Sequence, residues 1–309
     1  MVEFNGMTLA SVQRLSNRTT TQGSTMMGRI FIAAVLTLGL ALSQVMSATS
    51  GLAATLLEKA KAGEAVRLGF ANEVPWAYPG ENNEPLGFAN AFTLGVLEEM
   101  GITNIEPVVT EWGGLVPGLN ANRFDIITGG MYILGTRCEN VNFSDPMGVF
   151  GDAFIVAPGN PKGLETYQDI KESGGTLVTG AGYNIVEVAK QEGIPESNIM
   201  QVPGPTEILA AVRAGRADAG GVTHFTAQNL AEQSGGTVDV TDPAKLPDYT
   251  KNWVGIAFRK GDTEFLQAFN EAQDKYLGSP AMMEAVGKYG YTESNLPGDV
   301  TTEYACENR

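Results

Sequence analysis

The sequence has one histidine and two cysteines, and its basic residues are outnumbered by acidic ones, 20 to 35. The histidine, His224, has no partner at metal-ligand spacing, so it indicates neither a zinc site nor a catalytic triad and is most simply structural. The formal charge of -15 repels nucleic acid, and no basic stripe with interleaved aromatic residues offsets it. We therefore expect no metal, no cofactor and no nucleic-acid partner.

The apolar run at residues 30–40, IFIAAVLTLGL, is too short for a membrane anchor. It is broken at Ser43 and Gln44, before the roughly 18 to 20 residues that a stable membrane span requires. An arginine precedes the run and small residues follow it, which is the order of a secretory signal peptide. We expect residues 1–53 to be a signal peptide that directs the protein to the periplasm. Met26 would be a more typical start than the first residue, so a mis-assigned start is an alternative for the segment before it.

The two cysteines, Cys138 and Cys306, leave three alternatives: one disulfide, two free thiols or part of a metal site. An exported protein folds in an oxidising compartment, and an even pair in a chain with no other cysteine favours the disulfide there. Such a bond would tie the C-terminal segment to a region far earlier in the chain. In the chain-entropy model, closing so long a loop stabilises the fold by roughly 4 to 5 kcal/mol.

Length and hydrophobic pattern indicate two lobes of alternating strands and helices. A chain of 309 residues, 43% of them hydrophobic, exceeds the size at which one core usually keeps growing. Short apolar runs alternate with segments of helical spacing. The expected strands are residues 65–71, 105–110 and 123–127, and the expected helices between them are residues 92–100 and 114–120. This order predicts an α/β fold with a parallel sheet and right-handed crossovers.

A short phrase occurs twice, as LNANRFD at residues 119–125 and as VRAGRAD at residues 212–218. Each copy would close a helix, turn on a residue that tolerates a left-handed conformation and open a strand, as two lobes built alike would require. Coincidence between two short turns is the alternative. Apolar runs at residues 153–157 and 253–258 are expected to cross between the lobes. We predict one lobe from residues 54–155 and 256–309, and another from residues 156–255.

Polar and aromatic side chains follow the expected strands where the chain leaves each sheet. Ligands of α/β proteins bind at the carboxyl ends of strands, so these side chains would line a cleft between two facing lobes. The candidates in the first lobe are Glu73, Trp76, Tyr78, Trp112, Tyr132 and Arg137. In the second lobe, Thr223 follows one strand, and the glycine-rich segment GAGYN, which ends at Asn184, follows another.

Each candidate also has a simple structural alternative. Arg137 could be a solvated helix residue, but a guanidinium after a strand end can clamp a carboxylate with two parallel hydrogen bonds. The aromatic residues could be ordinary packing and Glu73 an exposed turn residue. Because aromatics follow three consecutive strands, we favour a ligand cage in which the rings and Glu73 attract a cation. The GAGYN segment lacks the lysine and the serine or threonine of a P-loop, so we interpret it as backbone amides open to an anionic group.

Several motifs together resemble the solute-binding proteins of ABC importers for polar amino acids and related compounds. They are ANEVPWAY, LGFANAF, EWGGLVPGLNANRFDIITGG, the R-x-x-x-V-x-F-S-x-P run from Arg137 to Pro146, AGRADA and VGIAFRKGD. The resemblance covers Gly63 to the C-terminus and implies a periplasmic-binding-protein type II-like fold, in which two Rossmann-like lobes joined by a two-strand hinge close on the ligand. It also implies a non-catalytic monomer that delivers its solute to an ABC permease in the inner membrane. A dehydratase on the same fold is the alternative from another class.

Within this family the chain is most similar to the ectoine- and hydroxyectoine-binding members, at Glu73, Trp76, Trp112, Tyr132, the Arg137-Cys138 pair and the C-terminal Cys306. The resemblance implies that Arg137 holds the ligand carboxylate, that Glu73 meets a delocalised ring cation and that the aromatic residues enclose it. It also implies a ligand contact at Asn184, although the glycine-rich loop differs in length.

One departure from the amino-acid-binding members narrows the ligand. Those members commonly have an aspartate, which holds the α-ammonium, at the position of Thr223, and they commonly read GFD where this chain has Gly87-Phe88-Ala89. Burying an ammonium without a partner is costly, so a pocket without this second anion favours a cyclic or substituted zwitterion. We expect an ectoine-like compatible solute, with a polar amino acid as the alternative.

Overall fold

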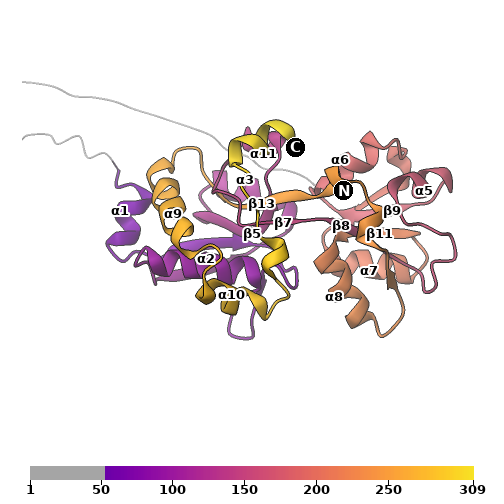
Figure 1. The fold of residues 1–309 in the computed structure, drawn as a ribbon, viewed down its shortest axis with the longest axis horizontal. Coiled ribbons are helices and arrows are strands. Elements are labelled where there is room, and N and C mark those ends of the chain that lie inside the picture. The colour runs from indigo at the N-terminus through magenta and orange to yellow at the C-terminus, as the bar shows by residue number, and fades with distance from the viewer. Residues whose placement is uncertain (1–52) are drawn as a thin grey trace, which may run out of the picture. The chain divides into compact units, whose positions relative to one another are not determined.

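The computed structural model describes residues 53–309 of the chain. Apart from Ala53, the signal peptide that the sequence predicts lies outside these residues. Two β-sheets with flanking helices organise the described part (Figure 1). None of its helices is long and apolar enough to cross a membrane.

The first sheet has the strand order β4-β1-β5-β13-β6, and β7 also pairs with β13. Its strands are β1 (Val66–Phe70), β4 (Ile105–Val109), β5 (Ile126–Tyr132), β6 (Asn142–Phe143), β7 (Gly148–Phe150) and β13 (Asn252–Phe258). A short ribbon of β2 (Tyr78–Pro79) and β3 (Pro85–Leu86) follows β1.

The helices that accompany this sheet lie on both of its sides. They are α1 (Leu56–Lys61), α2 (Phe88–Glu99), α3 (Leu115–Asn120), α4 (Gly135–Cys138), α9 (Thr263–Tyr276), α10 (Pro280–Gly287) and α11 (Thr302–Asn308), with short 3-10 turns η1 (Trp112–Gly114) and η5 (Glu293–Asn295). Figure 1 shows α2 and α10 on one side of β5, and α3 and α11 on the other. The sheet is therefore covered on both faces.

The second sheet repeats the plan, with the order β10-β9-β11-β8-β12. Its strands are β8 (Asp152–Val156), β9 (Leu177–Gly180), β10 (Ile199–Val202), β11 (Ala219–Thr223) and β12 (Asp239–Val240). The accompanying helices are α5 (Tyr167–Glu172), α6 (Asn184–Gln191), α7 (Pro205–Arg213) and α8 (His224–Ser234), with 3-10 turns η2 (Glu196–Asn198), η3 (Pro243–Lys245) and η4 (Asp248–Thr250). This sheet has its own apolar core.

The central strands are buried on both faces. All seven residues of β5 are buried, and successive residues face different cores. Ile126 packs in the core that contains Phe92 and Phe269, whereas Ile127 packs in the core that contains Leu115. A strand covered on both faces is apolar without interruption, and this is why continuous apolar runs located the strands in the sequence.

The two copies of the repeated phrase occupy equivalent places in the two sheets. The first joins α3 to β5 and the second joins α7 to β11, and their turns contain Asn122 at φ 56° and Gly215 at φ 64°. The carboxylates of Asp125 and Asp218 each accept a backbone N–H at the start of the neighbouring strand, at 3.0 and 2.9 Å. Both sheets therefore use the last residue of the phrase to fasten one strand to the next.

Each sheet is mixed, which corrects the expectation of a parallel sheet. β1 is parallel to β4 and β5, and β9 is parallel to β10 and β11. The apolar runs expected to cross between lobes, β13 and β8, pair antiparallel with β5 and β11. The chain enters each of these two strands from the other sheet and not through a crossover helix. The parallel pairing that a strand–helix–strand unit produces is therefore not expected for them. The predicted lobe boundaries, after residues 155 and 255, fall inside β8 and β13 and stay predictions.

The disulfide between Cys138 and Cys306 is confirmed, and it joins residues 168 positions apart in the sequence. It fastens α11 to α4, the short helix that contains Arg137. The N–H of Gly135 adds a hydrogen bond of 2.9 Å to a main-chain oxygen of Arg309. The C-terminal helix is thus tied to the segment that holds the predicted carboxylate clamp.

We predict that replacing both cysteines, Cys138→Ser together with Cys306→Ser, lowers the free energy of unfolding by up to roughly 4 to 5 kcal/mol, because the unfolded chain regains the entropy of a long loop. Urea denaturation followed by circular dichroism measures the loss. Adding a reductant to the unaltered protein should reproduce it. Equal unfolding free energies with and without the bond would contradict the prediction.

Candidate functional site

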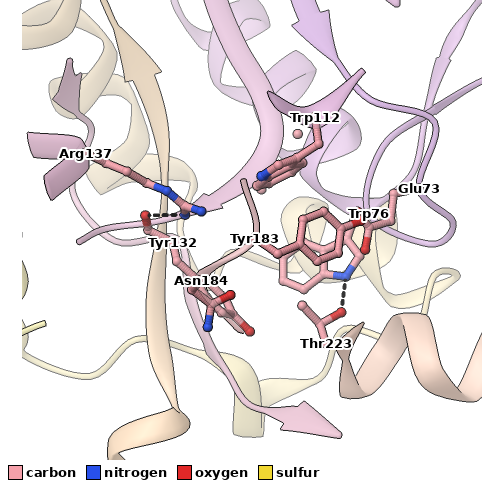
Figure 2. Close-up of a pocket in the computed structure, with 10 residues that line it drawn as sticks. Glu73, Trp76, Trp112, Tyr132, Arg137, Tyr183, Asn184 and Thr223 are labelled. Carbon is pink, nitrogen blue, oxygen red and sulfur yellow. Dashed lines mark hydrogen bonds between the residues drawn. The ribbon is translucent and has the colours of Figure 1, made fainter. Parts of the chain in front are cut away.

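A pocket collects side chains from both sheets (Figure 2). Its lining residues are Glu73, Trp76, Trp112, Gly129, Gly130, Tyr132, Arg137, Tyr183, Asn184 and Thr223. The structure thus brings together the seven residues that the sequence predicts as ligand contacts, and it adds two glycines of β5 and Tyr183. Tyr78, also a candidate by its position after β1, lies in β2 and does not line the pocket. The lining side chains leave room for little more than about one water molecule among them.

Every lining side chain comes from the carboxyl end of a strand or from the segment that follows it. Glu73 and Trp76 follow β1, Trp112 opens η1 after β4, Tyr132 ends β5, Arg137 lies in α4, Asn184 begins α6 after β9, and Thr223 ends β11. One detail differs from the sequence-based expectation. Tyr132 belongs to β5 and does not follow it, because β5 begins only at Ile126, after the turn at Asn122.

The Arg137 guanidinium is held by main-chain oxygens. It donates to the carbonyl of Tyr132 at 3.0 Å and, across the pocket, to the carbonyl of Gly182 at 3.1 Å. Its central carbon lies 5.8 Å from the centre of the Trp112 ring. Burial lowers the pKa of Arg137 to about 10, so the group stays charged at neutral pH. None of the ion pairs within residues 53–309 includes it, which leaves a desolvated cation suited to an anionic ligand group.

Glu73 is the acidic side chain of the pocket, and only 5% of it is exposed. Its carboxylate accepts hydrogen bonds from the Tyr183 hydroxyl (2.5 Å) and the Thr226 hydroxyl (2.7 Å). Thr226 accepts in turn from the Thr223 hydroxyl, whose oxygen accepts the indole N–H of Trp76. Burial raises the pKa of Glu73, and the two donated hydroxyl hydrogen bonds oppose that shift. A chain of donors therefore ends on this one carboxylate.

The aromatic residues of the pocket also take part in packing. Trp76 is 2% exposed, and its ring centre lies 4.5 Å from that of Phe88 and 4.7 Å from that of Phe150. Trp112 meets Tyr183 edge to face, with ring centres 5.4 Å apart. Trp76 therefore packs in the core on one side and presents its indole N–H to the pocket on the other. Core packing and a place in the ligand cage are thus compatible for this residue.

Asp152 lies beside the pocket and was not predicted from the sequence. It is the first residue of β8 and is 1% exposed. Its carboxylate accepts the Tyr132 hydroxyl at 3.3 Å and the side-chain amide of Asn184 at 3.1 Å, so it links the two sheets. Burial raises the pKa of Asp152 to about 7, although the two hydrogen bonds lower it. An aspartate opening an otherwise apolar crossing strand was the signal that could have identified it.

Two main-chain amides of the GAGYN segment are already engaged, and the interpretation of its amides as open to an anionic group stays a prediction. The N–H groups of Ala181 and Tyr183 donate to main-chain oxygens of Val202 and Gly180. The Gly182 carbonyl faces the first sheet instead, where it accepts the Arg137 hydrogen bond and the indole N–H of Trp112. The positive φ of 81° at Gly182 places the carbonyl there, and glycine adopts this conformation without strain. Tyr183, in this loop, is a second residue of the site that was not predicted from the sequence.

His224 follows Thr223 but does not line the pocket. Its imidazole is half-buried, and burial lowers its pKa. Within residues 53–309, no group of three or more histidine, cysteine, aspartate or glutamate side chains is placed to hold a metal ion.

We predict that Asp152→Asn removes a pH dependence of stability. Asp152 stays protonated in the folded protein up to about pH 7, but it ionises near pH 4 in the unfolded chain. Between these values the unfolded chain binds fewer protons, so the stability of the unaltered protein falls with rising pH, relative to the variant, by up to about 4 kcal/mol.

Urea unfolding of the solute-free proteins at intervals from pH 4 to 8 measures this difference. Asp299→Asn, at an exposed position, is the control and should track the unaltered protein. A stability difference between the unaltered protein and Asp152→Asn that stays constant over this range would contradict the prediction.

Comparison with known proteins places the chain in a family. The family model of bacterial extracellular solute-binding proteins, family 3, matches residues 66–291. The probable amino-acid ABC transporter periplasmic-binding protein y4tE of Sinorhizobium fredii (strain NBRC 101917 / NGR234) is 33% identical over 276 residues, which cover 87% of this chain and 91% of the relative.

Two solved structures extend the comparison. EhuB in complex with hydroxyectoine superposes with a TM-score of 0.74 at 26% identity, covering 81% of this chain and 97% of that chain. The ancestral amino acid-binding protein AncCDT-1, a precursor of cyclohexadienyl dehydratase, superposes with a TM-score of 0.67 at 26% identity, covering 77% and 100%. The predicted two-lobed, periplasmic-binding-protein type II-like fold is confirmed, and the chain belongs to the bacterial extracellular solute-binding proteins, family 3.

Proposed function

We propose that this protein is a periplasmic solute-binding protein of an ABC importer and that its pocket binds an ectoine-like compatible solute. One observation carries the proposal: the ten lining residues include one cation, Arg137, and one anion, Glu73, and no ion pair joins them. A small zwitterion supplies both missing partners in one molecule. The aromatic side chains around these two groups suit a flat, delocalised cation.

The carboxylate of the solute would bind Arg137. The guanidinium now donates only to neutral carbonyl oxygens, at 3.0 and 3.1 Å. Exchanging a neutral acceptor for a carboxylate gives shorter and stronger hydrogen bonds, and a planar guanidinium can form two of them in parallel. This is the role that the resemblance implies for Arg137.

The cationic part of the solute would lie against Glu73, with Trp76, Trp112 and Tyr132 around it. Cation–π attraction contributes about 0.5 to 2 kcal/mol for each well-placed ring. Thr223 and Asn184 would add polar contacts from the second lobe. Thr223 is a hydroxyl donor and acceptor, and Glu73 is the one carboxylate among the ten lining residues, with Asp152 beside them. The EhuB complex with hydroxyectoine supports a ligand of this kind.

A polar amino acid is the second candidate, and the comparisons favour it as much. Both y4tE and AncCDT-1 are named as amino-acid binders. In that case Glu73 would hold the α-ammonium and the solute carboxylate would still bind Arg137. The two candidates therefore share Arg137 and differ in what lies against Glu73.

The remaining parts of the proposal follow from the family. We propose a monomer in which residues 54–155 with 256–309 and residues 156–255 form two hinged lobes, and in which closure over the solute is recognised by an inner-membrane permease. We also propose that the protein does not catalyse a reaction. A solute recovered unchanged after long incubation is expected, and its conversion would support the dehydratase alternative.

We predict that Arg137→Lys weakens ectoine binding by roughly 100-fold, because lysine cannot reproduce two parallel hydrogen bonds and a charged hydrogen bond contributes about 1.5 to 3 kcal/mol. Isothermal titration calorimetry measures the dissociation constant. Arg123→Lys, at an exposed position in the same lobe, is the matched control and should bind like the unaltered protein.

The same titrations with 5-hydroxyectoine, glycine betaine, arginine and glutamine separate the two candidates. Tight binding of an amino acid without any ectoine signal would reject the ectoine assignment. Undiminished binding of every solute by Arg137→Lys would reject the clamp itself.

A further inference from the structure

The loop between β9 and α6 touches both charged groups of the pocket. The Gly182 carbonyl accepts from Arg137 at 3.1 Å, and the hydroxyl of the next residue, Tyr183, donates to Glu73 at 2.5 Å. Figure 2 shows the Tyr183 ring between Arg137 on one side and Glu73 on the other. Two adjacent residues therefore present an acceptor to the cation and a donor to the anion.

These contacts match the chemistry that a zwitterionic solute would offer. A solute carboxylate accepts from Arg137, as the Gly182 carbonyl does, and a solute N–H donates to Glu73, as the Tyr183 hydroxyl does. The Gly182-Tyr183 pair and the solute would thus compete for the same atoms.

The Tyr183 ring is fitted to its place. A methyl group on Gly180 would lie 2.5 Å from the ring, so the bare glycine permits the ring to lie against the backbone. Trp112 meets the ring edge to face, and its indole N–H donates to the Gly182 carbonyl at 3.2 Å. The positive φ at Gly182 orients the carbonyl toward the cation. The bare Gly180, the contacts of Trp112 and the positive φ of Gly182 therefore all favour the same placement of the Gly182 carbonyl and the Tyr183 ring.

We propose that the Gly182-Tyr183 pair is an internal competitor of the solute: it occupies Arg137 and Glu73 when the lobes close, and a solute binds by exchanging with it. This inference rests on the proposed function, since it takes those two side chains as the poles of the site. The Gly182-Tyr183 pair therefore favours solutes that can replace both of its hydrogen bonds. A solute that contacts only Arg137 or only Glu73 replaces one of them, whereas a zwitterion with an N–H donor replaces both.

The test uses Tyr183→Phe, which keeps the ring and removes the hydroxyl. Tyr304→Phe, at an exposed tyrosine of α11, is the matched control. Without its bond to Glu73 the competitor is weaker, so we expect the dissociation constant for ectoine to fall by roughly tenfold to 100-fold. Small-angle X-ray scattering of the solute-free proteins should also give a larger radius of gyration for Tyr183→Phe than for the unaltered protein. This radius should decrease when ectoine saturates the Tyr183→Phe variant.

The two measurements separate this inference from the proposed function. Equal radii for Tyr183→Phe and the unaltered protein would overturn the inference, whichever solute binds. Weaker ectoine binding by Tyr183→Phe would also overturn it, because the hydroxyl would then be a contact to the solute. If neither protein binds ectoine but Tyr183→Phe is expanded, the inference stands and the ectoine assignment fails.

Discussion

Arg137 and Glu73 are opposite charges in one pocket, and each is bonded to neutral groups instead of to the other. Main-chain oxygens surround the guanidinium, and two hydroxyls donate to the carboxylate. In a desolvated site an ion bonded to neutral dipoles gains by exchanging one of them for an opposite charge. A direct ion pair would satisfy both groups and leave nothing for a ligand. The separation of these two charges is thus the constraint that the surrounding structure must maintain.

The fold maintains it by holding both charged groups on elements of the first sheet. Glu73 follows a buried strand, and Arg137 lies in a short helix that the disulfide and the C-terminal helix hold in place. The apolar cores of the two sheets are separate clusters. The contacts that cross the pocket combine hydrogen bonds with the edge-to-face contact of Trp112 and Tyr183, and hydrogen bonds can be exchanged for equivalent ones at low cost, whereas a packed core cannot.

Much of the fold could be predicted from the sequence, because buried strands of a doubly covered sheet are continuous apolar runs. The expected strand at residues 65–71 corresponds to the buried β1, and the one at residues 105–110 corresponds to β4, a partly exposed strand at the edge of the same sheet. The repeated phrase correctly marked the turns at Asn122 and Gly215, since only residues that tolerate a left-handed conformation suit them. The antiparallel direction of β8 and β13 was missed, because the pattern of a buried strand is the same in either direction.

The sequence by itself determined which side chains follow which strands, and so it predicted the seven residues that meet in the pocket, together with the Cys138–Cys306 pairing. Only the tertiary structure decided how these side chains satisfy one another. Tyr183 and Asp152 contact partners far from them in the chain, on the opposite sheet. No local pattern encodes a contact of that kind, because it depends on how closely two separately folded bodies approach and on which polar groups they bring into hydrogen-bonding distance.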